Sequence, residues 1–140
     1  LDRYAVVGMS EAWATQSIIT AIESDARTAA FTFESMLRGG VPPLRMAELA
    51  AAHLAGSKAT LELDLDAVAQ APASAAAASG FSGAEFRSMA TMLANTVQLQ
   101  AAHIAEGAPG NGAWPTEMLA KLVAELTRDI ATAVLRSPRA

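Results

Sequence analysis

The sequence contains no cysteine, and this absence excludes several kinds of chemistry. Disulfide bonds, thiolate nucleophiles and cysteine-based zinc or iron–sulfur sites are all ruled out. Charge is also scarce, because charged residues make up only 17% of the 140 residues and the ten Lys and Arg residues are scattered singly. Proteins that bind DNA or RNA present a clustered basic surface to the phosphates. We therefore expect no nucleic-acid binding.

Long apolar runs are missing as well. The apolar stretches are interrupted by Ser, Glu, Arg or Asp, so none reaches the roughly 20 residues that a membrane crossing needs. No signal peptide is visible either. We therefore expect no membrane contact by this segment itself. The chain begins Leu1-Asp2-Arg3 rather than with Met, and we expect it to be a fragment of a larger protein.

Catalytic and metal-binding motifs are also lacking. No Gly-x-Ser-x-Gly elbow and no phosphate-binding loop occurs. The two histidines, His53 and His103, would need a carboxylate such as Glu48, Glu106 or Asp64 to hold a metal, and their arrangement matches no di-metal ligand motif. Asp64 and Asp66 would point in different directions on a helix, which favours a solvated face. We therefore predict a protein that is not an enzyme, with no cofactor and no metal.

What the sequence does contain is a strong helical signal. It is 52% hydrophobic and rich in alanine, the residue with the highest helix propensity. Glycine and proline divide it into four amphipathic stretches, so we predict helices over residues 2–38, 43–69, 82–106 and 115–136. Short connections between such helices favour an all-α, four-helix antiparallel bundle with up-down-up-down topology. We expect one domain over residues 1–140, with an unusually long first helix.

Local signals support several of these boundaries. Gly39-Gly40 is typical of a helix C-cap, and the segment from Ser82 to Glu85 has the pattern of a capping box. The run Leu61-Glu62-Leu63-Asp64-Leu65-Asp66 alternates between apolar and acidic residues, which is a strand pattern. Because no partner strand is recognised elsewhere in the sequence, we assign this run to the end of the second helix.

A polar ridge on the first predicted helix is the candidate ligand site. Gln16, Thr20, Glu23 and Arg27 recur at steps of three and four, and Glu23 and Arg27 form a favourable i,i+4 pair. The Arg27 guanidinium has the geometry to orient a small anion or carboxylate. Trp13 has the size to wall an apolar pocket. The alternatives are a solvated helix face for the ridge and ordinary packing for the tryptophan.

A longer pattern resembles a known family of sensors. It consists of Glu23-x-x-x-Arg27, then Met36-Leu37-Arg38-Gly39-Gly40-Val41, then Glu48-Leu49 and an alanine-rich helix to Leu65, with Trp114-Pro115-x-x-Met118 further on. These segments resemble the extracytoplasmic nitrate- and nitrite-sensing-like domains of actinobacterial sensor histidine kinases. The resemblance implies an extracytoplasmic domain of a membrane protein that passes a ligand-driven shift to a kinase, with Arg27 and Arg38 as binding positions.

We therefore predict a ligand-sensing and signal-relaying domain of a larger signalling protein. Its expected ligand is a small molecule or anion bound by Arg27, Arg38, Trp13 and Glu23, and a homodimer through the first or fourth helix is expected as well. Two alternatives stay open. One is the effector-binding and dimerisation domain of a helical transcription regulator, and the other is a structural helical domain of a larger enzyme. A cytoplasmic location is the alternative to an extracytoplasmic one.

Overall fold

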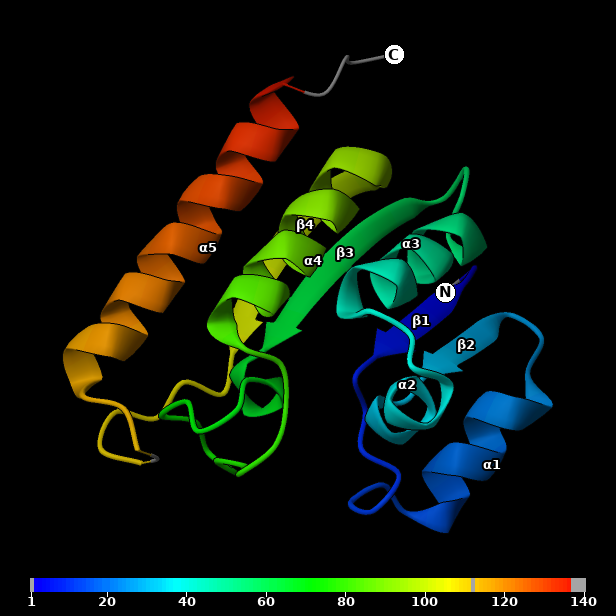
Figure 1. Cartoon of the computed structure of the whole chain (residues 1–140). Helices are drawn as coiled ribbons and strands as arrows, with labels where there is room; N and C mark the ends of the chain where they lie inside the picture. The colour runs from blue at the N-terminus through cyan, green and yellow to red at the C-terminus, as the bar shows by residue number, and fades with distance from the viewer. Residues whose placement is uncertain (1, 112, 137–140) are drawn as a thin grey trace.

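The computed structural model of the chain describes residues 2–111 and 113–136 and contains both helices and strands (Figure 1). The elements follow one another as β1 (Tyr4–Val7), α1 (Gln16–Ser24), β2 (Thr28–Phe31), α2 (Phe33–Gly39), α3 (Pro43–His53), β3 (Lys58–Asp64), the 3-10 helix η1 (Leu65–Ala67), α4 (Gly83–Thr96), β4 (Gln98–Ala105) and α5 (Thr116–Arg136). Among the described residues, no helix is both long enough and apolar enough to span a membrane.

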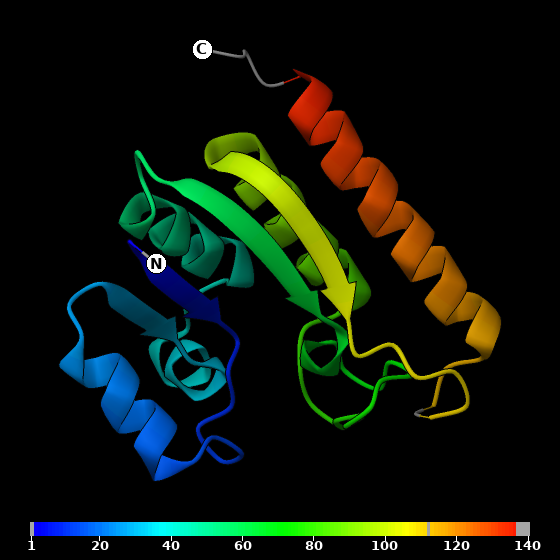
Figure 2. The ribbon, with the colours of Figure 1, turned by 180° about the vertical axis from the view of Figure 1, so that it is seen from behind.

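The strands form two separate parallel pairs. β1 pairs with β2 from Tyr4↔Thr28 to Val7↔Phe31, and β3 pairs with β4 from Lys58↔Gln98 to Asp64↔Ala105. Within each pair the chain returns through a helix, α1 or α4, as a parallel connection requires. The four strands run in one direction, with β1 and β3 on the facing sides of the two pairs (Figure 2). Their carboxyl ends therefore lie at the same end of the molecule.

A layer of helices covers one face of the strands. α3 contacts β1 and β2, α4 contacts β3, and α4 also packs between α3 and α5. The opposite face of β3 and β4 is open in the view from behind (Figure 2). Side chains on β3 follow this division, because Leu63 is buried whereas Glu62 and Asp64 are exposed. The strand thus separates an apolar helix-facing side from an acidic open side.

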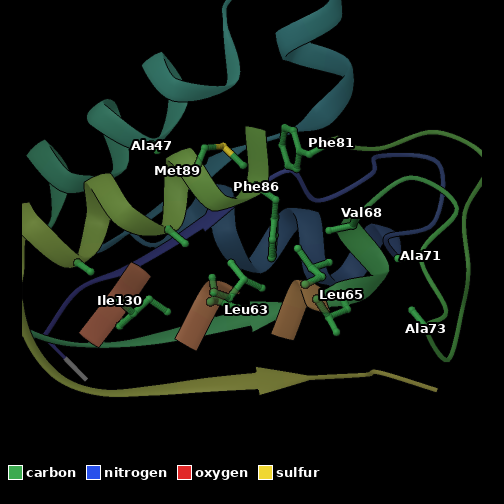
Figure 3. Packing of buried hydrophobic residues seen from close by; sticks show 14 of the residues in the cluster. Ala47, Leu63, Leu65, Val68, Ala71, Ala73, Phe81, Phe86, Met89 and Ile130 are labelled. Carbon is green, nitrogen blue, oxygen red and sulfur yellow. The ribbon is translucent and has the colours of Figure 1, made fainter. Parts of the chain in front are cut away.

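Small apolar side chains and large ones occupy different parts of the core. Alanines, which bring helix backbones close together, are almost completely buried where α3 and α4 meet, with Ala47 at 0% and Ala90 at 1% exposure. Larger side chains fill the space beneath α4, where Phe86 points toward β3 and Met89 toward α3 (Figure 3). α5 contributes apolar residues at steps of three and four, as an amphipathic helix does. These are Leu119, Leu122, Leu126, Ile130 and Ala133.

The predicted all-α bundle is wrong, and its first helix shows why. Residues 2–38 form β1, α1, β2 and α2 rather than one helix. Thr15 and Thr32 each begin a new helix by accepting a hydrogen bond from a backbone N–H three residues on. Gly8 has a positive φ of 83° and ends β1, and a Cβ there would lie 2.3 Å from the Phe81 ring. The alanine-rich sequence favours helix throughout residues 2–38. The high helix propensity of alanine therefore masked the breaks between the four elements in the sequence pattern.

Residues 61–64 of the alternating run lie in a strand and residues 65–66 begin η1, so the assignment of this run to the end of an α-helix is wrong. β3 includes residues 58–64, and its partner β4 occupies residues 98–105, which had been assigned to the predicted helix 82–106. The pairing shifts register between Ala59 and Thr60, and this irregularity accompanies a β4 sequence without regular alternation. The partner strand therefore had no recognisable period-2 pattern.

The signals at helix ends were more reliable. α2 ends at Gly39, and Gly40 adopts the left-handed conformation of a C-cap. Ser82 and Glu85 form the predicted capping box at the start of α4. α5 begins and ends within one residue of its predicted limits. These features depend only on neighbouring residues, so the sequence determines them without knowledge of the fold.

Candidate functional site

Three acidic side chains gather where β3 and β4 end. Asp64 is the last residue of β3, Asp66 lies in η1, and Glu106 directly follows β4. Asp64 is paired in register with Ala105, so the two chain segments leave the sheet side by side. The carboxyl ends of parallel strands are where α/β proteins place their binding and catalytic residues. We refer to Asp64, Asp66 and Glu106 as the acidic cluster.

Hydrogen bonds from neighbouring loops hold the acidic cluster in place. The Asp66 backbone N–H donates to Oδ1 of Asp64 over 2.9 Å. The Ala75 backbone N–H donates to Oδ1 of Asp66 over 2.9 Å, and the Ser74 hydroxyl lies 3.3 Å from Oδ2 of the same carboxylate. That hydroxyl also makes a short hydrogen bond to Oε2 of Glu106. Because the Ser74 hydroxyl has only one proton, Asp66 and Glu106 compete for it, and the shorter contact is the one with Glu106.

The cluster carries negative charge without a cationic partner. Although Asp64 is exposed as a residue, partial desolvation of its carboxyl raises its pKa, the hydrogen bond from the Asp66 amide lowers it, and the charges of Asp66, Glu106 and Glu62 raise it further, for a net upward shift. The ion pairs among the described residues involve none of these four acids. An uncompensated group of carboxylates favours binding of protons or of a cationic ligand.

The loop between η1 and α4 brings Ser74 to this position. Its two ends are tied together, because the Phe81 N–H donates to the Ala67 carbonyl and the Ala69 N–H donates to the Phe81 carbonyl. A Cβ on Gly80 would lie 2.5 Å from the Ala67 carbonyl oxygen, so this close crossing requires glycine. The Ser74 N–H donates to the backbone carbonyl of Glu106 over 2.8 Å. The loop is thereby fixed to the end of β4.

An open hollow of about 490 Å³ lies beside the cluster, between β4 and α5. Glu106 contributes to its wall, and most of the remaining lining is apolar. The apolar side chains include Leu65, Ile104, Leu119 and Val123. A carboxylate at the edge of an apolar hollow suits a ligand with a cationic group on an aliphatic stem.

The described residues contain no group of three or more His, Cys, Asp or Glu side chains placed to hold a metal ion. His53 is engaged elsewhere, with its Nε2 3.0 Å from the Arg27 carbonyl oxygen. His103 lies on β4, in register with Glu62. His103 also lines the hollow to which Glu106 contributes.

The four residues predicted to bind a ligand do not form one site. Trp13 lies in the loop between β1 and α1 and is 86% exposed. Arg38, at the end of α2, forms an ion pair with Glu11 in that same loop, so these two segments do meet. Arg27 lies before β2 and pairs with Asp25 over 2.7 Å. Glu23 lies on α1, which ends at Ser24, so the expected continuous ridge from Glu23 to Arg27 is absent. Ligand binding by these residues stays a prediction.

The acidic cluster was not predicted, although part of its signal is visible in the sequence. The alternating run places Asp64 at the end of a strand and Asp66 directly after it. Assigned to a helix, the two carboxylates were expected to diverge. Glu106 and Ser74 have no local signal, because they reach the cluster only through the pairing of β3 with β4 and the path of the following loop.

The chain matches no protein-family model, and no curated protein sequence matches it significantly. Solved structures do resemble it. Trypanosoma cruzi formiminoglutamase with Mn²⁺ matches with a TM-score of 0.78 at 14% identity, over 98% of this chain and 45% of that one. Helicobacter pylori arginase matches with a TM-score of 0.73 at 17% identity, over 93% and 43%. Proclavaminate amidino hydrolase from Streptomyces clavuligerus matches with a TM-score of 0.72 at 15% identity, over 93% and 43%.

These likenesses overturn the sensor interpretation. The resemblance to nitrate-sensing domains, the sensing and relaying function with its regulator alternative, and the prediction that the protein is not an enzyme are contradicted by a fold shared with hydrolases. The extracytoplasmic location rested on the sensor resemblance and falls with it. The homodimer and the small-molecule or anion partner stay predictions. The chain spans less than half the length of these three proteins, and what it shares with them is the α/β fold of the arginases and formiminoglutamases.

Proposed function

We propose that this chain forms part of a hydrolase that cleaves a carbon–nitrogen bond in an amidino-type substrate, and that the acidic cluster belongs to its active site. The convergence of Asp64, Asp66 and Glu106 at the carboxyl ends of parallel strands carries the proposal. The likeness of the fold to arginase, formiminoglutamase and an amidino hydrolase supports the substrate class.

Glu106 is proposed to bind the substrate. Amidino and guanidino groups are cationic and planar, and they pair with carboxylates through charge-assisted hydrogen bonds. Oε1 of Glu106 accepts no hydrogen bond among those found in the described part of the chain, whereas Oε2 accepts from Ser74. The neighbouring hollow offers apolar surface from Leu65 and Leu119 for an aliphatic stem.

Asp64 is proposed to transfer a proton. Hydrolysis adds water to the amidino carbon and breaks a carbon–nitrogen bond, and the departing amine takes up a proton. A carboxyl whose pKa is raised toward the working pH exchanges protons more effectively than an ordinary aspartate. Partial desolvation and the surrounding carboxylates raise the pKa of Asp64.

The Mn²⁺ of the formiminoglutamase structure raises the question of whether these residues fit a metal centre. Carboxylate oxygens are ligands that Mn²⁺ accepts. However, the described residues contain no group of three or more His, Cys, Asp or Glu side chains placed around a common point. The residues of this chain therefore do not make up a complete metal site, and we assign no catalytic step to a metal.

The test is hydrolysis by the native gene product with arginine and formiminoglutamate as substrates, following loss of substrate and appearance of the amine product by mass spectrometry. Asp64→Asn is expected to lower kcat by about 10² to 10⁴-fold, the range for loss of a proton-transferring group. Glu106→Gln is expected to raise KM more than it lowers kcat, because it removes the charge that binds the substrate.

The matched control is Glu48→Gln, which removes a carboxylate that pairs with Arg45 on the surface of α3. It should leave the rate unchanged. Full activity in Asp64→Asn and Glu106→Gln, or no hydrolysis of any amidino substrate by the unmodified protein, would refute the proposal.

A further inference from the structure

Glu106 has a backbone conformation that residues with a side chain rarely adopt. Its φ is 66°, in the left-handed region, and Gln70 is the only other described residue apart from glycine with a positive φ. The Cβ of an ordinary residue clashes with the backbone in this region. Such a residue is held there by the surrounding structure, and it is found most often at functional sites. A glutamate therefore occupies a position whose conformation suits glycine.

A short pairing with the loop after η1 holds Glu106 in this conformation. Ala73 and Gly107 form an antiparallel β-bridge, and the Ser74 N–H donates to the Glu106 carbonyl over 2.8 Å. Ala73 is completely buried, so the loop is anchored directly before Ser74. The backbone at Glu106 is thus fixed by a segment from a different part of the chain.

The Ser74 side chain restrains the carboxylate as well. Its hydroxyl lies 2.5 Å from Oε2 of Glu106 but 3.3 Å from Oδ2 of Asp66, so its single proton is directed to Glu106. Ser74 and Glu106 are both exposed, and the long side chain of an exposed glutamate otherwise samples several rotamers. Ser74 therefore holds Glu106 twice, once at its carbonyl and once at its carboxylate.

A fixed carboxylate suits the planar cation expected at this site. Pairing of a carboxylate with an amidino or guanidino group depends on the relative orientation of the two planes. A side chain that is already ordered loses less conformational entropy on binding. Glu106 also lines the apolar hollow between β4 and α5, so its orientation determines how a substrate stem enters that hollow.

We propose that Ser74 is a positioning residue, which holds the strained Glu106 with its carboxylate in one orientation for a planar cationic group. The proposal rests on the proposed function in taking Glu106 as the residue that binds the substrate. Ser74 acts through Glu106, so removal of its hydroxyl weakens substrate binding more than it slows the chemical step.

The first test compares Ser74→Ala with Ser74→Thr in the native gene product, with the amidino substrates used above. Ser74→Ala is expected to raise KM roughly tenfold, the effect of losing one hydrogen bond to a charged group, and to change kcat less. Ser74→Thr keeps the hydroxyl and should restore KM, and Ser88→Ala should leave it unchanged. An unchanged KM in Ser74→Ala, or no recovery in Ser74→Thr, would overturn the inference.

Crystal structures of the unmodified protein and Ser74→Ala, in one crystal form, test the positioning without measuring catalysis. We expect a single Glu106 conformer in the unmodified protein and several in Ser74→Ala. The same single conformer in both would overturn the inference even in an active enzyme. Release of Glu106 in Ser74→Ala, with no hydrolysis by the unmodified protein, would refute only the proposed function.

Urea unfolding of Glu106→Gly and Glu106→Ala tests the strain, because both variants lack the carboxylate. At an ordinary φ alanine gives the more stable protein, whereas at a positive φ glycine does. We therefore expect a higher unfolding midpoint for Glu106→Gly. A higher midpoint for Glu106→Ala would overturn the inference that Glu106 is held in a strained conformation.

Discussion

Two aspartates, Asp64 at the end of β3 and Asp25 after α1, have pKa values that are shifted in opposite directions. Partial desolvation and, to a smaller extent, the charges of neighbouring acids raise the pKa of Asp64. Asp25 faces the Arg27 guanidinium, which together with the Arg27 amide lowers its pKa to about 2. The same residue type is thus shifted in two directions by two environments. The effect of pH on stability follows from the direction of each shift.

We expect Asp64→Asn to stabilise the protein at neutral pH. A carboxyl with a raised pKa in the folded state keeps its proton more readily when folded, so folding is penalised at pH values above that pKa. The gain over the unmodified protein should shrink as the pH falls toward the ordinary aspartate value of 3.8. Urea unfolding measured between neutral pH and pH 4 checks this.

Asp25→Asn is the matched control, with the opposite sign. A depressed pKa contributes stability above the ordinary pKa, and that contribution is lost as the pH falls through about 2. This variant should therefore be slightly less stable than the unmodified protein at neutral pH. A stabilisation by Asp64→Asn that does not depend on pH would show that the charge of Asp64 is not the cause.

At the scale of helices and strands, the sequence predicts what neighbouring residues determine. The capping box at Ser82 and Glu85, the C-cap at Gly40 and the limits of α5 are local, and all are found in the structure. β4 could not be predicted, because Gln98–Ala105 is a strand only by virtue of lying beside β3. The candidate site could be predicted only in part for the same reason. The alternating pattern places Asp64 and Asp66 at the end of a strand, but their proximity to Glu106 depends on the pairing of β3 with β4.

The capping box offers a test at this scale. Ser82→Ala removes the hydroxyl that accepts from the Glu85 N–H over 3.2 Å, and an N-cap change of this kind costs about 0.5 to 2 kcal/mol. Ser88→Ala is the control, because the Ser88 hydroxyl donates only within α4, to the Ala84 carbonyl. Thermal and urea unfolding should show the loss for Ser82→Ala and little change for Ser88→Ala. Equal losses would mean that the cap contributes nothing specific.

At the scale of the whole molecule, Phe81 connects the two strand pairs. It is 1% exposed, packs edge-on against Phe33 with ring centroids 5.6 Å apart, and lies close to Gly8 at the end of β1. Its backbone meanwhile pairs with the segment that follows β3. The β1–β2 pair and the β3–β4 pair share no backbone pairing in the described residues, so side-chain packing of this kind holds them together.

We therefore expect Phe81→Ala to cost about 3 to 5 kcal/mol, the range for truncating a buried phenylalanine. Because the change affects the junction between the pairs, unfolding should also lose cooperativity, with a lower dependence on urea concentration. Trp13→Ala is the control, since that side chain is 86% exposed. An equally small effect for both variants would show that the junction is held by other contacts.

The division of β3 into an apolar side and an acidic side has a consequence for solubility. A strand edge with unpaired backbone groups invites pairing with other chains, and nearby charges oppose such contact. Lys58, Glu62 and Asp64 are exposed along this strand. Glu62 and Asp64 place negative charge on the open face of β3, so we expect two copies that meet there to repel each other. Acidification that protonates Asp64 weakens that repulsion, so aggregation should begin at this strand as the pH falls.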